Sequence, residues 1–136
     1  MININIYWFF SDATLAANMP QFHLNGKWKS TDSEIISNKV ESDTGSLEFV
    51  WVESKKEKFR FSGKADGLAA KGKIEKWKEP DALSALLNFG VKQEGKFESH
   101  GDGYVFLSNN LDTLTIFVQE SDGKKHRSMQ FHKASE

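Results

Sequence analysis

Side chains that could carry acid–base or metal chemistry are present in this chain, but their spacing does not bring them together. The chain has four histidines, at positions His23, His100, His126 and His132. His126 and His132 fall on the same face of a predicted strand, where the rise per residue separates them by about 20 Å. That distance is too long for one shared metal ion. We expect both to face solvent, because Met129 and Phe131 take the apolar side. We predict no metal site and no cofactor.

Carboxylates are candidates for general acids or bases. Those in the second half of the chain include Glu94, Glu98, Asp102, Asp112 and Glu120. They alternate with apolar residues or lie in turns, as on a solvated face.

Residues 67–73 have the glycines of a phosphate-binding loop, but Ile74 follows, and a strand is expected in place of the helix whose amides bind phosphate. We expect no catalytic motif, and keep as a third alternative a barrel enzyme using Tyr104 or a carboxylate at the mouth.

Aromatic side chains are the stronger functional signal. They make up 12% of the 136 residues, and eleven of them are phenylalanines. We predict that rings on several strands, together with Phe131, line the interior. The candidate ligand-binding residues are Phe49, Trp51, Phe59, Phe61, Phe97, Tyr104, Phe106 and Phe117. Two interpretations stay open, a solid core and a cavity for an apolar ligand. Segments 47–52 and 114–118 are apolar on both faces. A third interpretation is therefore that an outer apolar face is buried in an oligomer.

Composition excludes some classes of function. The 18 basic and 19 acidic residues give a net charge of -1, which argues against binding of nucleic acid through its phosphates. The chain has no cysteine, so disulfides and thiolate sites are excluded. It has no run of 18 or more apolar residues, and we therefore predict no membrane span.

The first 25 residues differ from the rest. Residues 2–10 are apolar and alternate as in a strand. Residues 15–17 faintly resemble a signal-peptide cleavage site, but no basic residue precedes Lys27, so the basic segment that begins a signal peptide is missing. We interpret 1–25 as an N-terminal strand or arm with a connector, and 26–136 as one β-barrel domain. The compartment is unknown from the sequence, and we favour the cytoplasm over export.

From residue 26 onward the pattern is one short strand after another. The expected strands cover 27–31, 34–41, 46–53, the residues around 59–61, 68–77, 91–99, 104–108, 113–120 and 124–133. Turn signals separate them, including Ser42–Gly45, His100–Gly103 and Ser121–Gly123. One short helix is expected at 82–88. The sequence predicts an all-β protein, an antiparallel meander of eight to ten strands closed into a barrel.

The two ends of this predicted barrel carry a family pattern. Leu24-Asn25-Gly26-Lys27-Trp28-Lys29, together with the closing segment 121–131 and its Arg127, resembles the calycin group, which includes lipocalins, fatty-acid-binding proteins and avidins. Members begin the first strand with Gly-x-Trp and often carry an arginine on the last strand. The resemblance implies a calycin-like barrel in which the Arg127 guanidinium stacks on Trp28 and plugs one end. Arg127 shares strand parity with Phe131, so it needs a partner on the apolar side.

These observations lead to two functional hypotheses. The first is non-enzymatic binding of a small apolar or amphipathic molecule in the barrel cavity. The alternative is a protein-interaction module, of inhibitor or immunity type, with a filled barrel and an outer face that binds. A packed interior with exposed rings would favour the alternative. A homo-oligomer is compatible with both.

Overall fold

Alternating apolar and polar residues build an eight-stranded antiparallel barrel. The computed structural model describes residues 22–80, 94–121, 123 and 125–134. Its strands are β1 (Trp28–Lys29), β2 (Ser33–Glu41), β3 (Ser46–Glu53), β4 (Lys58–Asp66), β5 (Ala69–Lys78), β6 (Lys96–Leu107), β7 (Thr113–Glu120) and β8 (His126–Lys133). Each strand pairs with the next, and β1 pairs with β8, so the sheet is closed. The predicted all-β closed meander is therefore confirmed, with eight strands.

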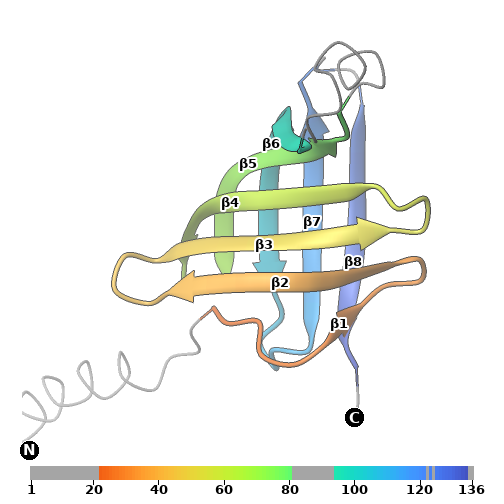
Figure 1. The fold of residues 1–136 in the computed structure, drawn as a ribbon. Coiled ribbons are helices and arrows are strands. Elements are labelled where there is room, and N and C mark those ends of the chain that lie inside the picture. The colour runs from red at the N-terminus through yellow and green to blue at the C-terminus, as the bar shows by residue number, and fades with distance from the viewer. Residues whose placement is uncertain (1–21, 81–93, 122, 124, 135–136) are drawn as a thin grey trace, which may run out of the picture.

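Two layers of strands cross in this barrel. In Figure 1, β2 to β4 run across β6 to β8 at a steep angle, and β5 curves from one layer to the other. Such curvature needs small residues where strands approach closely. Gly63 of β4, Gly72 of β5 and Gly103 of β6 are paired in one row. A Cβ on Gly63 or Gly72 would overlap the backbone of the neighbouring strand, so these glycines permit the bend.

Aromatic rings fill the interior between the layers. Phe49, Trp51, Phe59 and Phe61 are at most 2% exposed. The ring centroids of Phe49 and Phe61 are 5.2 Å apart and those of Trp51 and Phe59 are 5.3 Å apart, both pairs stacked. Phe49 also contacts Trp51 at 5.7 Å. These distances correspond to direct ring packing, so this part of the interior is solid.

The turn predicted at His100–Gly103 is wrong. β6 continues through these residues as one strand, with a register shift at His100 that is a β-bulge. The two glycines face the interior, where an added Cβ would meet the strand or side chain opposite. Asp102 points outward, and its carboxylate accepts a hydrogen bond of 2.7 Å from Lys73. Glycine at these two positions allows neighbouring strands to pack closely. The resulting sequence has the composition of a turn although the residues lie within a strand.

Several predictions fall on residues outside the described part of the chain. These are the helix at 82–88, the strand at 2–10 and most of the connector that ends at residue 25. Phe22 and Leu24, at the end of that connector, are buried in the barrel core. Among the described residues there is no helix, and hence none that is long and apolar enough to cross a membrane.

Trp28 and Arg127 do not meet, contrary to the predicted plug. Trp28 is 1% exposed and pairs with Lys133 at the end of β8. Its indole Nε1 donates a hydrogen bond to the carbonyl oxygen of Asn25 at 3.2 Å. Arg127 lies at the beginning of β8, six positions before Lys133, which is a rise of about 20 Å. The two side chains therefore belong to opposite ends of the barrel.

Candidate functional site

The predicted ligand-binding rings divide into an inner and an outer set. Phe49, Trp51, Phe59 and Phe61 lie inside, as expected. The outer set is 40 to 46% exposed and comprises Tyr104, Phe106 and Phe117. The expectation that these three line the interior is thus corrected. Their neighbours on β6 and β7, such as Val105 and Ile116, take the inward positions. Tyr104 is accordingly not at the barrel mouth.

Phe97 belongs to a separate outer cluster. Its ring packs edge-on against Trp77 with centroids 5.0 Å apart. The Arg60 guanidinium lies 4.3 Å from the Phe97 centroid, and the Lys58 ammonium lies 4.8 Å from the Trp77 ring. Contact of any of the eight predicted rings with a ligand remains a prediction.

The outer aromatic face, as we name it, consists of Tyr104, Phe106 and Phe117. Tyr104 and Phe117 are directly opposite each other on β6 and β7. The rings of Phe106 and Phe117 pack edge to face with centroids 5.8 Å apart. On the β5 side, the ammonium of Lys71 is 5.7 Å from the centre of the Tyr104 ring. Three neighbouring rings therefore remain in contact with solvent on one side of the barrel.

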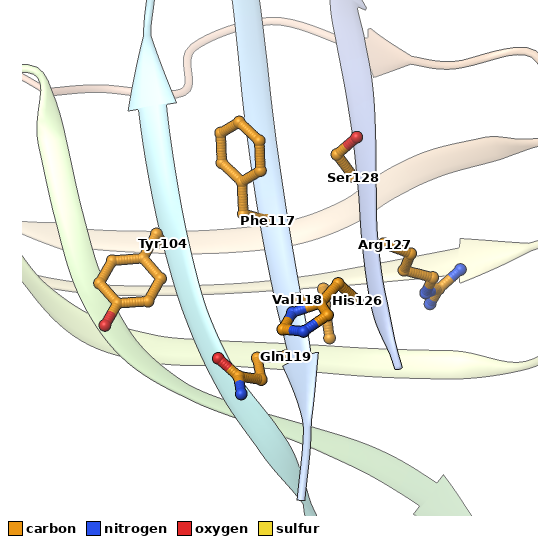
Figure 2. A pocket seen from close by; sticks show the side chains of 7 residues that line it. All are labelled: Tyr104, Phe117, Val118, Gln119, His126, Arg127 and Ser128. Atoms are coloured by element: carbon orange, nitrogen blue, oxygen red, sulfur yellow. The ribbon is translucent and has the colours of Figure 1, made fainter. Parts of the chain in front are cut away.

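A groove lies beside this face. It has a volume of about 370 Å³, and its lining comes from β6, β7 and β8. Figure 2 shows its lining residues, Tyr104, Phe117, Val118, Gln119, His126, Arg127 and Ser128. We call it the outer groove. Tyr104 and Phe117 belong both to this groove and to the outer aromatic face, so the two features are continuous.

Arg127 has a partner at its own end of the barrel. Its guanidinium makes two hydrogen bonds to the Glu53 carboxylate, of 3.0 Å and 2.7 Å. The indole of Trp51 donates a third, of 3.1 Å, to the same carboxylate. The guanidinium carbon also lies 5.0 Å from the centre of the Phe59 ring. Arg127 therefore has an inner partner, as its position on the apolar side of the strand predicts, and that partner is Glu53.

An ion pair and a histidine–carboxylate contact also lie near Phe59 at this end. Lys76 is 3.0 Å from the carboxylate of Glu57, and His100 is 3.3 Å from that of Glu120. The hydrogen bond from Lys76 lowers the pKa of Glu57. This pair therefore stabilises the fold above the unfolded-state pKa of the carboxyl group and ceases to do so as the pH falls through the folded value. The groups bound a hollow of about 310 Å³ over Phe59.

The sequence reasoning did not single out Glu53. The signal was present, since Glu53 continues the inward positions of Leu47, Phe49 and Trp51 on β3. An acidic residue at an inward position at the end of such a series requires a cation. Within the described residues, no three His, Cys, Asp or Glu side chains are grouped so as to hold a metal ion.

Comparison with known proteins gives no match. No family model matches the chain, and neither a curated protein nor a solved structure matches it. The candidate site is therefore defined by its geometry alone.

We predict measurable coupling between Glu53 and Arg127. In a double-mutant cycle of Glu53→Gln and Arg127→Met, the coupling free energy of unfolding should be about 1 kcal/mol, because the contact is bidentate and half-buried. The matched control is the exposed ion pair Lys39–Glu41 on β2, where we expect a value near zero. Denaturant unfolding measures both. Equal coupling in the two cycles would contradict the structural role of the Arg127 contact.

Proposed function

We propose that this chain is a protein-interaction module that binds another polypeptide through its outer aromatic face. The observation that carries the proposal is the division of the rings. Four are packed against one another inside the barrel, whereas Tyr104, Phe106 and Phe117 are 40 to 46% exposed outside it. A filled interior leaves the outer surface as the place where the aromatic side chains are available to a partner.

The energetics support a polypeptide partner. Phe and Tyr are enriched in the centres of protein interfaces, where they act as anchors. Nearly half of each of these side chains remains to be buried, which is worth about 1 kcal/mol per ring. The three rings are neighbours on adjacent strands, so one partner surface is able to cover them together.

The calycin relationship is part of this proposal. Gly26-Lys27-Trp28 leads into the first barrel strand, and Trp28 is buried at the adjoining end. The closed eight-stranded antiparallel meander is compatible with that group. Arg127 departs from the pattern, since it contacts Glu53 and Phe59 at the other end.

A second candidate function is binding of a small apolar or amphipathic molecule in the outer groove. The groove volume of about 370 Å³ falls within the usual range for ligand pockets, roughly 300–1,000 Å³. Tyr104 and Phe117 provide apolar walls, and Gln119, His126 and Ser128 provide polar groups. This site would place the ligand outside the barrel instead of in the interior cavity expected from the sequence.

Photo-crosslinking tests the main proposal. With benzoylphenylalanine in place of Phe117, the chain should form adducts with a polypeptide in cells that express it. The same amino acid in place of Ile36, which is 49% exposed on β2, is the matched control and should give little adduct. The interface lies elsewhere if Ile36 gives as much adduct as Phe117, or if Phe117 gives none.

Native mass spectrometry of the freshly purified chain tests the second candidate. A bound small molecule should add its mass to that of the chain, and Tyr104→Ala should abolish the adduct because it removes a groove wall. Phe106→Ala is the control, because Phe106 belongs to the outer aromatic face but does not line the groove. An adduct that survives Tyr104→Ala would rule out this binding site.

A further inference from the structure

We propose that the hollow over Phe59 binds a small organic carboxylate, which takes the place of the Glu57 side chain beside Lys76. We call this hollow the mouth hollow; it is lined by the end of β3, the turn that follows and strands β4 to β8. The inference goes beyond the proposed function and uses none of the rings of the outer aromatic face. Arg127 borders both hollows, but Figure 2 shows its side chain directed away from the rings of the outer groove.

The mouth hollow is built on the closed sheet. Each strand from β3 to β8 contributes one of its lining residues, so these side chains are carried on elements that hold one another in place. The mouth of a barrel is a common position for a small-molecule site, and the volume of about 310 Å³ is near the lower end of the usual range, roughly 300–1,000 Å³. Beneath the hollow, Phe59 stacks on Trp51 at 5.3 Å. The hollow therefore suits a compact molecule and leaves no room for a long chain.

Three nitrogen-bearing side chains surround the ring of Phe59. From the ring centre, the guanidinium carbon of Arg127 is 5.0 Å away, the ammonium of Lys76 is 5.8 Å away, and the centre of the His100 ring is 5.5 Å away. Phe59 itself is only 2% exposed. The floor of the hollow consequently presents nitrogen groups to a ligand in place of apolar carbon.

The cations at the mouth hollow have more N–H groups than their protein partners use. An arginine carries five N–H donors and a lysine three. Among the described residues, Arg127 makes two hydrogen bonds to Glu53, and Lys76 makes one contact of 3.0 Å to Glu57. The remaining donors are able to bind oxygen atoms of a ligand, and a carboxylate accepts hydrogen bonds at both of its oxygens.

The side chain of Glu57 shows where an anion is stabilised in the hollow. The hydrogen bond from Lys76 lowers the pKa of Glu57, and the charges of Lys55 and Arg127 lower it as well. Three cations from the β3–β4 turn, β5 and β8 thus favour a negative charge at one position. Glu57 is an internal occupant of this position.

Glu57 is replaceable by an external anion, whereas Glu53 is not. The Glu53 side chain is 18% exposed and accepts three hydrogen bonds, two from Arg127 and one from Trp51. The Glu57 side chain is 37% exposed, lies in the turn before β4, and has the single contact with Lys76. An exposed ion pair of this kind contributes little to stability. An external carboxylate is therefore able to displace Glu57 and take over its contact with the Lys76 ammonium.

Titration of the full chain with succinate, followed by the amide signals in NMR spectra, tests the inference. Wild type should show saturable shifts for residues 53–59 and for His100. Lys76→Met should abolish these shifts, because it removes the ammonium that holds the anion. Glu57→Gln should lower the Kd for succinate by about threefold or more, because the internal competitor is gone and the binding-competent state is more populated.

The matched control is the exposed ion pair Lys73–Asp102, in which Nζ and Oδ1 are 2.7 Å apart. Asp102→Asn changes the net charge by the same amount as Glu57→Gln, and Lys73→Met by the same amount as Lys76→Met. Both control variants should bind succinate as wild type does. Inorganic phosphate has a similar charge at neutral pH and should bind more weakly, since the position accommodates a planar carboxylate. Misfolding cannot produce the gain expected for Glu57→Gln, so the test does not depend on the stability of Lys76→Met.

Four results would each overturn the inference. They are the absence of saturable shifts in both wild type and Glu57→Gln, an affinity of Glu57→Gln no higher than that of Asp102→Asn, wild-type affinity in Lys76→Met, and tighter binding of phosphate than of succinate. None of them bears on crosslinking from Phe117, so the proposed function stands or falls separately.

Discussion

Stacking of four aromatic rings inside the barrel is the constraint on which the rest depends. Phe49 packs on Phe61 and Trp51 packs on Phe59, with centroids 5.2 Å and 5.3 Å apart. Protein interiors are close-packed, so space occupied by these rings is not available to a ligand. The same alternation that sends one set of side chains inward sends Tyr104, Phe106 and Phe117 outward. Rings that pack inside the barrel and rings that are exposed outside it are thus two results of one alternating pattern.

The two ends of the barrel carry different chemistry. At one end, the indole Nε1 of the buried Trp28 donates a hydrogen bond to the carbonyl oxygen of Asn25. At the other, Arg127 covers Phe59 and is held by Glu53. A guanidinium on the inner side of a barrel is acceptable because two hydrogen bonds to a carboxylate offset its desolvation.

Much of the fold was predictable, because a period of two residues determines both strand and orientation. Parity alone correctly separated Phe131 from His126 and His132 on β8. It was insufficient on β6 and β7, where inward and outward positions are both apolar, so Tyr104 and Phe117 were placed inside. His100–Gly103 has the composition of a turn, but its glycines accommodate neighbouring strands. Trp28 is far from Arg127 because β1 pairs with the last residues of β8. The sequence alone does not reveal this register.

The central claim is that the barrel interior is occupied by its own side chains. Nuclear Overhauser effects between ring protons of Phe49 and Phe61, and of Trp51 and Phe59, test it most directly. We expect both sets of cross-peaks, and no change in these ring signals when a long-chain fatty acid is added. Missing cross-peaks, together with interior ring signals that shift on addition of the fatty acid, would contradict it.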